Sequence, residues 1–262
     1  MLKDVIDIVL RASELMMSGD FLVEHKDGCL ENIVTSSDVA VQDFLCKELR
    51  SLVPGCGFFC EEKDLQEECK EYTWIIDPID GTANYARGIA QCAISVALSH
   101  NGEVVLGVVY VPFMNELYCA EKGGGAMLDG RPIHVSDRPF EDGILCTAMS
   151  TYRKQYAHLC NSIIMDAYMD CNDVRRFGSA AVELCCLAKG NCELYFEFRL
   201  QSWDYAAAML ILQEAGGYIC NLEGKLPRLD GPDLILAANN TESLSRLLQT
   251  ARKYVKEIPY TD

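Results

Sequence analysis

An apolar run that ends in two aspartates around a proline constrains the fold of this chain more than any other segment. The run reads WIIDPIDGTANY and spans Trp74 to Tyr85. Its apolar start is typical of a β-strand. Pro78 fixes its own φ and pushes Asp77 toward an extended conformation, so we expect the strand to end at Asp77. Gly81 permits a backbone geometry that other residues resist, and its N–H can face an approaching anion.

The end of this strand would gather several oxygen atoms. The carboxylates of Asp77 and Asp80 would converge there with a backbone carbonyl and the hydroxyl of Thr82. Hard oxygen ligands of this kind are the ones that Mg²⁺ prefers. The alternative is a simple acidic turn, because Asp, Pro and Gly are turn residues in any case.

Three further carboxylates stand next to predicted secondary structure. Glu61 follows an apolar Phe-Phe pair, and Asp38 precedes a predicted helix over residues 41–49. Asp204 opens a predicted buried helix over residues 205–215, which a Gly-Gly pair would close. Each helix-side aspartate has a simpler interpretation, since Asp204 could be an N-cap and Asp38 could complement the helix dipole.

The four segments that contain Asp38, Glu61, Asp77 and Asp204, in this order along the chain, resemble the inositol monophosphatase family, within the larger group of magnesium-dependent, lithium-sensitive phosphatases. The signature D-P-[IL]-D-G-T-x-N is intact at residues 77–84, and W-D-x-A-A…E-A-G-G is intact at residues 203–217. Residues 178–181 resemble the G-[ST]-A-A element, and residues 124–130 resemble the G-x-G-A…N-G hairpin. The resemblance covers nearly the whole chain.

The resemblance implies a role for each matching residue. Two or three Mg²⁺ ions would be bound by Glu61, Asp77, the carbonyl of Ile79, Asp80 and Asp204. The catalytic residues would be Glu61, Asp38 and Thr82, of which the last two hold the attacking water. The N–H groups of Gly81 and Thr82 would bind the phosphate. The substrate pocket would be lined by Gly178, Ser179, Ala180, Glu197 and Asp204.

The chain departs from the family pattern at a few positions. Cys60 stands where the family usually has Gly, which could alter the approach of Glu61. Asn32 stands where some relatives have Asp, and Lys26 aligns only loosely with a basic residue of relatives.

The same chemistry follows from the residues without the family. Uncatalysed hydrolysis of a phosphate monoester is among the slowest biological reactions. A pair of metal ions can both activate water and stabilise the leaving alkoxide, and such a pair needs several carboxylates in one place. The chain has no G-x-S-x-G elbow and no cysteine with an obvious His partner for covalent catalysis. Direct attack by activated water is therefore the better interpretation.

The substrate is less constrained than the reaction. Myo-inositol monophosphate is favoured by Glu197 and by Asn84-Tyr85, where inositol enzymes often have Asn-Phe. Fructose 1,6-bisphosphate, a 3′-phosphoadenosine nucleotide or NADP would need more cationic groups, for which the candidates are Arg87, Arg175, Arg176 and Arg199. A relative that binds a ligand without turnover is a third hypothesis, and the intact acidic residues argue against it.

Composition narrows the partners. The net charge of −16 argues against a nucleic-acid backbone and against anionic membranes as partners. The 14 cysteines include no C-x-x-C pair, so we interpret them as buried free thiols in a reducing cytoplasm. Residues 1–18 predict an amphipathic helix rather than a secretory leader, and no apolar stretch is long enough to span a bilayer.

Periodicity predicts a layered α/β protein. Strands are expected at residues 74–76, 92–98, 104–111 and 234–237, a hairpin at the Asp129-Gly130 turn, and helices near the N-terminus and over 41–49, 179–188 and 205–215. The resemblance implies a five-layer α-β-α-β-α sandwich and a homodimer. We expect an N-terminal half over residues 1–140 and a C-terminal half over residues 141–262, with the metal cleft between them.

Overall fold

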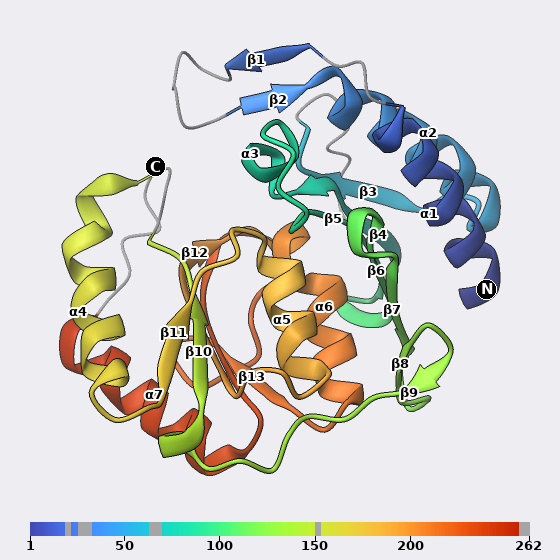
Figure 1. The fold of residues 1–262 in the computed structure, drawn as a ribbon. Helices are drawn as coiled ribbons and strands as arrows, with labels where there is room; N and C mark the ends of the chain where they lie inside the picture. Colours follow the sequence, from blue (N-terminus) through green and yellow to red (C-terminus); the bar gives the residue numbers. More distant parts are fainter. Residues whose placement is uncertain (19–21, 26–32, 63–69, 150–152, 257–262) are drawn as a thin grey trace.

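The computed structural model describes residues 1–18, 22–25, 33–62, 70–149 and 153–256. Helices and sheets alternate in five layers, as expected (Figure 1). The two outer layers and the middle layer are helical. The helices are α1 (Leu2–Met17), α2 (Ser36–Leu52), α3 (Thr82–Tyr85), α4 (Ala157–Tyr168), α5 (Ala180–Ala188), α6 (Ser202–Glu214) and α7 (Thr241–Tyr254).

The first sheet lies between the α1–α2 layer and the α5–α6 layer. It has seven strands in the order β3-β4-β5-β6-β7-β8-β9, and all neighbours are antiparallel except the parallel pair β3 and β4. Its strands are β3 (Gly57–Cys60), β4 (Tyr72–Asp80), β5 (Ala93–His100), β6 (Glu103–Val111), β7 (Glu116–Glu121), β8 (Ala126–Leu128) and β9 (Arg131–Pro132).

The second sheet lies between the α5–α6 layer and the α4–α7 layer. Its order is β11-β10-β12-β14-β13, in which β10 is parallel to both neighbours and β14 is antiparallel to both of its own. The strands are β10 (Ile144–Thr147), β11 (Asp173–Arg175), β12 (Leu194–Leu200), β13 (Tyr218–Cys220) and β14 (Asp233–Ala238). A separate hairpin joins β1 (Val23–His25) to β2 (Ile33–Thr35).

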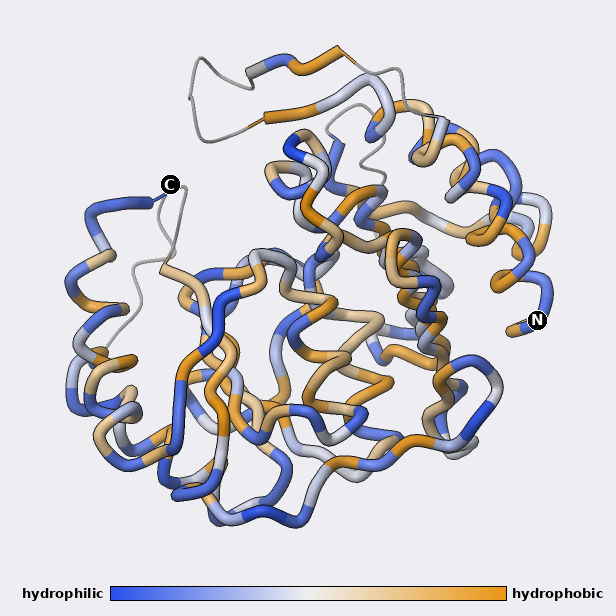
Figure 2. Tube along the Cα trace, viewed as in Figure 1, coloured by the Kyte–Doolittle hydropathy of each residue, from blue (hydrophilic) through white to orange (hydrophobic). Residues whose placement is uncertain are grey.

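Successive side chains of a strand point to opposite faces of the sheet, so the first sheet contributes to two hydrophobic cores. Trp74 and Ile76 of β4 pack toward α1 and α2, whereas Ile75 between them packs toward the middle helices. The outer helices present one apolar face, but α6 is buried on most sides because a sheet covers it on each side. Figure 2 shows this as mixed blue and orange on α1 and α7 and mainly tan and orange in the middle.

The middle layer joins parts of the chain that are distant in sequence. Its helices α5 and α6 follow residue 140, yet they share one core with Ile75, Val109 and Ala120 of the first sheet. The division into residues 1–140 and 141–262 stays a prediction.

One expected boundary is wrong. The strand predicted to end at Asp77 continues to Asp80, and its pairing with β5 resumes at Asp80 opposite Ala93 after an irregularity. Pro78 has no N–H for the ladder, but its φ is compatible with extended backbone, so the strand is interrupted rather than ended. The next N–H, of Ile79, donates to Asp77 Oδ1 at 3.0 Å.

The other predicted elements are found, some with longer bounds. The Asp129-Gly130 turn connects β8 to β9, with φ of 50° and 73°, as a two-residue hairpin loop requires. The prediction missed α4, α7, β7 and the strands β10 to β12.

The described ranges bear on two expectations, one about the cysteines and one about membrane-spanning helices. No cysteine in the described ranges forms a disulfide and most are buried, whereas Cys29 and Cys69 lie outside these ranges. No helix in the same ranges is both long and apolar enough to cross a bilayer.

Candidate metal centre and active site

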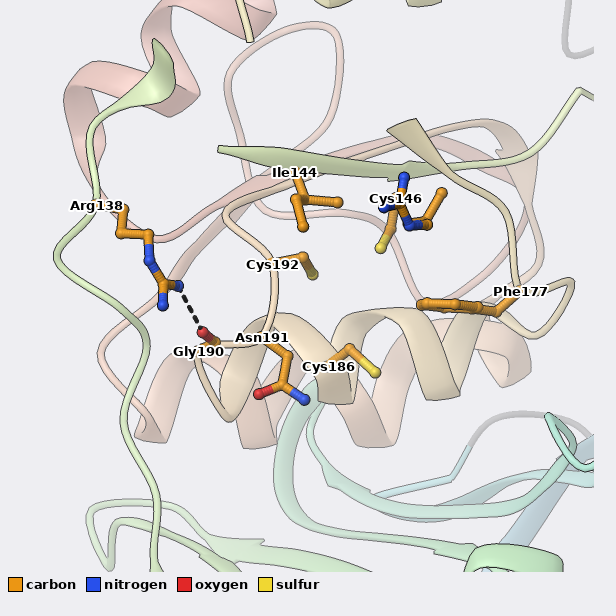
Figure 3. Close-up of a pocket in the computed structure, with 9 residues that line it drawn as sticks. Arg138, Ile144, Cys146, Phe177, Cys186, Gly190, Asn191 and Cys192 are labelled. Carbon is orange, nitrogen blue, oxygen red and sulfur yellow. Dashed lines mark hydrogen bonds between the residues drawn. The ribbon is translucent and has the colours of Figure 1, made fainter. Parts of the chain in front are cut away.

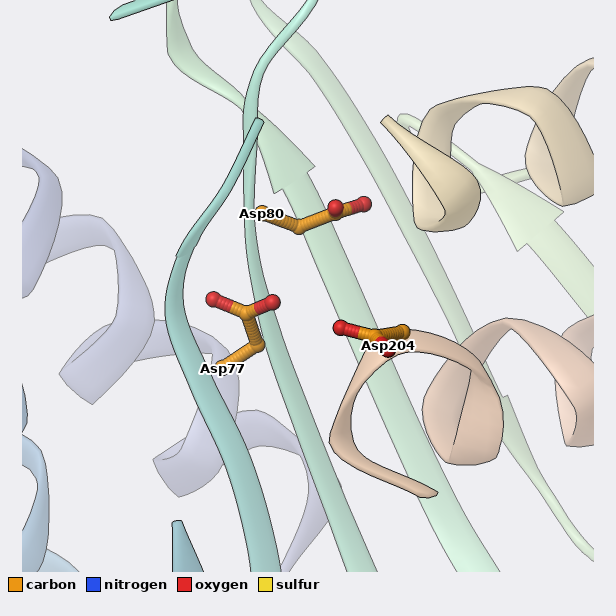
Figure 4. Close-up of side chains that lie close together, drawn as sticks. All are labelled: Asp77, Asp80 and Asp204. Atoms are coloured by element: carbon orange, nitrogen blue, oxygen red, sulfur yellow. The ribbon is translucent and has the colours of Figure 1, made fainter. Parts of the chain in front are cut away.

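Three carboxylates from two distant segments meet at the edge of the middle layer. Asp77 and Asp80 come from the end of β4, and Asp204 comes from the first turn of α6 (Figure 4). One oxygen of each lies within 4.8 Å of one oxygen of the others. Such a group of oxygen atoms can hold a hard divalent cation such as Mg²⁺.

Asp204 is held by the start of its own helix. Gln201 is the N-cap of α6, and Asp204 Oδ2 accepts a 2.8 Å hydrogen bond from the Gln201 N–H. Asp204 is therefore the third helical residue of a capping box and not the N-cap itself. Its helical role and its place in the cluster are compatible, because a carboxylate has a second oxygen.

Asp80 is held from the opposite side by α5. Its Oδ2 accepts the Ser179 hydroxyl at 2.6 Å and the Ala181 N–H at 2.7 Å. Burial raises the pKa of Asp80 to about 6, although these hydrogen bonds lower it. Ser179 thus lines the pocket while its hydroxyl is directed to an aspartate of the cluster.

The cluster concentrates negative charge in a buried place. Burial raises the pKa of Asp77 well above its usual value, and repulsion from Glu61, Asp80 and Asp204 raises it further. The pKa of Asp204 is also raised by burial and by repulsion from Asp80 and Glu61. A bound divalent cation would relieve this repulsion, and every donor here is an oxygen, so the residues fit Mg²⁺.

Two of the predicted ligands lie beside the cluster. Glu61 follows β3 and is half-buried, close enough to raise the pKa of Asp77, but it lies outside the group that meets within 4.8 Å. The Ile79 carbonyl accepts the Thr82 hydroxyl at 3.1 Å and keeps a second lone pair.

Cys60, which stands where the family usually has Gly, is the last residue of β3 and is fully buried against α2. Its Sγ lies 3.8 Å from Cys46 Sγ, so its side chain packs away from solvent. The residues Lys26 and Asn32 lie outside the described ranges.

Asp38 and Thr82 form a hydrogen-bonded pair. Thr82 Oγ1 lies 3.1 Å from Asp38 Oδ1, while Asp38 Oδ2 accepts the Thr35 N–H at 2.7 Å. Asp38 is also the third helical residue of α2 in a capping box with Thr35. Burial raises the pKa of Asp38 to about 7, with smaller contributions from Glu61 and Glu62.

Gly81 adopts a left-handed backbone with φ of +89°, a geometry that other residues resist. A Cβ at this position would lie 3.1 Å from the carbonyl oxygens of both Gln91 and Gly178. Only glycine therefore fits here without a shift of the neighbouring backbone.

A pocket of about 390 Å³ opens onto the cluster. It brings together all of the residues that were predicted for phosphate and substrate, together with the predicted metal ligand Asp80. They are Asp80, Gly81, Thr82, Gly178, Ser179, Ala180, Glu197 and Asp204. Of the candidate cationic residues, Arg87 and Arg176 line the pocket, whereas Arg175 and Arg199 do not.

Glu197, on β12 of the second sheet, lines the pocket. Its Oε2 accepts the Tyr195 hydroxyl at 2.6 Å. Burial raises the pKa of Glu197 to about 7, and Arg176 lowers it slightly.

Glu183 also lines this pocket and was missed by the sequence reasoning. It is 1% exposed and lies in the first turn of α5. The signal was present, because a single acid stands inside the apolar run AAVELCCLA. A charged residue in such a run requires a specific partner.

The model of the inositol monophosphatase family matches residues 3–256. The chain belongs to this family. It is 35% identical to "Inositol-1-monophosphatase" of Mesorhizobium japonicum over 224 residues, which covers 84% of this chain and 83% of the relative. It is 36% identical to "Nus factor SuhB" of Xylella fastidiosa over 247 residues, which covers 89% of this chain and 88% of the relative.

Solved structures of family members show the same fold. The Thermotoga maritima IMPase aligns with a TM-score of 0.86 and 29% identity, over 97% of this chain and 98% of that one. An inositol monophosphatase from Anabaena aligns with a TM-score of 0.84 and 28% identity, over 97% and 96%. The five-layer architecture is therefore that of this phosphatase family.

Proposed function

We propose that this chain is a Mg²⁺-dependent phosphomonoesterase that hydrolyses myo-inositol monophosphate to inositol and phosphate. The observation that supports the proposal most is the meeting of Asp77, Asp80 and Asp204 beside a pocket. No single turn of the chain could assemble this cluster, because its members come from two segments more than a hundred residues apart.

The metal would be held by Glu61, Asp77, the Ile79 carbonyl, Asp80 and Asp204, with two or three ions in the site. Bound Mg²⁺ supplies charge neutralisation for the phosphoryl group and lowers the pKa of water.

The chain itself would orient the reactants. The N–H groups of Gly81 and Thr82 would bind phosphate oxygens. The Thr82 hydroxyl, paired with Asp38, would orient the attacking water, and Asp38 would accept its proton. A carboxyl with a pKa of about 7 is suited to accept a proton near neutral pH.

The choice of inositol rests on Glu197 and on the pocket it faces. A carboxylate in the pocket lining can accept hydrogen bonds from substrate hydroxyls. The name of the Mesorhizobium relative points to the same substrate. Arg87 and Arg176 in the pocket lining keep the alternative substrates open, because each could bind a second phosphate.

The relatives named Nus factor SuhB support a second candidate function, the binding of a macromolecular partner. The net charge of −16 favours a protein over a nucleic-acid backbone as that partner. A homodimer, a cytoplasmic location and sensitivity to lithium belong to the same proposal by family analogy.

The decisive experiment is a phosphate-release screen with Mg²⁺ and with EDTA. The substrates are inositol 1-phosphate, fructose 1,6-bisphosphate, a 3′-phosphoadenosine nucleotide and NADP. We expect Mg²⁺-dependent release that is fastest with inositol 1-phosphate. Preference for another substrate would contradict the inositol assignment, and no release from any substrate would contradict the phosphatase assignment.

A further inference from the structure

The segment Phe177-Gly178 lies in the connection between β11 and α5. It packs against Gly81, whose N–H is proposed to bind phosphate. We propose that Glu183 and Asn84 are positioning residues that hold this segment from both sides and thereby fix Gly81, an inference that rests on the proposed function. We call Glu183, Asn84 and the segment Phe177-Gly178 together the Phe177–Gly178 clamp.

Glu183 provides the acceptor side of the clamp. Its Oε1 accepts the N–H groups of Phe177 at 2.5 Å and of Gly178 at 3.0 Å. Its Oε2 is buried and has no hydrogen-bond partner among the described residues. An ionised carboxylate that is buried with one oxygen lacking a hydrogen bond raises the free energy of the folded state. We therefore expect Glu183 to carry a proton on Oε2. Burial and the nearby Glu197 raise its pKa accordingly.

Asn84 provides the donor side. Its Nδ2 donates to the Phe177 carbonyl at 2.7 Å and to the Gln91 carbonyl at 2.6 Å. Asn84 also belongs to α3, the short helix that follows Gly81, and its N–H donates to the Gly81 carbonyl at 2.8 Å. Asn84 therefore connects Gly81 to the segment that follows β11 of the second sheet.

The segment leaves no free space next to Gly81. The Gly178 carbonyl oxygen lies 3.1 Å from the place where a Cβ of Gly81 would be. In return, a Cβ on Gly178 would lie 3.2 Å from Asn84 Nδ2. A shift of Phe177-Gly178 would therefore be transmitted directly to the backbone that is proposed to bind phosphate.

The side chain of Phe177 packs against the core around α5 and α6 but also borders open space. Phe177 lines the candidate active-site pocket and also a second cavity of about 350 Å³. Figure 3 shows the ring at the side of that cavity, which Cys146, Cys186 and Cys192 also line. Because the ring has open space on one side, we infer that the hydrogen bonds to its backbone contribute to its position.

The test compares Glu183→Ala with Glu183→Gln. The glutamine keeps a carbonyl oxygen for both N–H groups and resembles the protonated acid, whereas alanine removes the acceptor. The control is Glu193→Ala, because Glu193 is equally buried and also accepts a backbone N–H, that of Ile144, but does not line the active-site pocket.

The first measurement is hydrogen exchange of the Phe177 and Gly178 amides by NMR. We expect exchange about tenfold faster or more in Glu183→Ala, close to wild type in Glu183→Gln, and unchanged in Glu193→Ala at matched stability. Wild-type exchange in Glu183→Ala would overturn the proposal. If that variant does not fold, Asn84→Ala is measured instead, and unchanged exchange there is equally contrary.

The second measurement is turnover. We expect Glu183→Ala to lower kcat/KM about 100-fold, because a small displacement of binding groups has an effect of this size. The loss should be equal for inositol 1-phosphate and an aryl phosphate, since the clamp acts at the phosphate. Recovery in Glu183→Gln is expected, and a loss restricted to inositol phosphate would contradict the proposal. An inactive wild-type protein would refute the phosphatase assignment, while the exchange measurement would still decide on the clamp.

Discussion

The Ser179 hydroxyl donates a 2.6 Å hydrogen bond to Asp80. Ser179 is the N-cap of α5, and Asp80 belongs to the three-carboxylate cluster. The start of a middle-layer helix therefore orients an aspartate of the first sheet. A metal ligand that is oriented in this way binds more tightly, because less order has to be imposed when the ion arrives.

Ser179→Ala is expected to weaken Mg²⁺ binding by about 10-fold or more, since partners of ligand residues contribute this much to metal affinity. It should also reduce the free energy of unfolding by about 1 kcal/mol through the lost helix cap. Calorimetric titration with Mg²⁺ measures the first effect. The control Ser179→Thr keeps the hydroxyl, and equal affinity in all three proteins would show that the hydrogen bond has no role.

Asp77→Asn is expected to abolish hydrolysis and leave the fold intact. It removes one charge from a group whose members repel one another, so the metal-free variant should be at least as stable as the wild type. Saturating Mg²⁺ should raise the Tm of the wild type by about 5 °C or more, and that of the variant much less. Thermal denaturation with and without Mg²⁺ measures this.

The matched control for that substitution is Asp166→Asn, because Asp166 lies on α4 and pairs with Lys253 far from the cluster. It should keep both turnover and the response to Mg²⁺. Wild-type turnover in Asp77→Asn would remove the metal-ligand assignment.

Thr82→Val removes a hydroxyl at nearly constant side-chain volume. We expect kcat to fall about 100-fold or more, as for other groups that orient or transfer a proton. Thr82→Ser keeps the hydroxyl next to Asp38 and should keep most of the activity. Steady-state kinetics of both variants test the pair, and a similar kcat for valine and serine would speak against it.

Glu197→Gln is expected to raise KM for inositol 1-phosphate far more than for an aryl phosphate. The reason is that Glu197 lines the pocket and is proposed to accept hydrogen bonds from the inositol hydroxyls, which an aryl phosphate lacks. An equal change for both substrates would remove the case for inositol recognition.

Glu197 should also make the free energy of unfolding depend on pH. Burial raises the pKa of Glu197 from 4.5 to about 7. The folded protein then binds a proton more tightly than the unfolded chain, so this stabilisation is complete below about 4.5 and is lost as pH rises through about 7. Without metal, the wild type should lose more stability than Glu197→Gln across this range. Parallel curves of unfolding free energy against pH would contradict the prediction.

The local parts of the site could be predicted from sequence. The motif around Pro78 contains its own turn, and Gly81 has the left-handed backbone that its sequence context requires. Asp38 and Asp204 were expected at helix starts, and both lie there in capping boxes. These features depend on a few neighbouring residues, so a local pattern is sufficient to predict them.

The long-range parts could not be predicted in this way. The approach of Asp204 to Asp77 depends on the packing of α6 between two sheets, which no local pattern contains. Glu183 was missed because its partners, the N–H groups of Phe177 and Gly178, are backbone atoms that are identical in every sequence. The boundary of β4 was wrong because pairing with β5 maintains the strand beyond Pro78.

The helices α5 and α6 follow residue 140 in the chain but cover the inner face of the seven-stranded sheet, which precedes it. A fragment that stops at residue 140 would expose that apolar face to water and would have no counterpart for Asp77 and Asp80. Two separately produced fragments would regain the acidic cluster only on recombination, so cation binding would report fragment complementation directly.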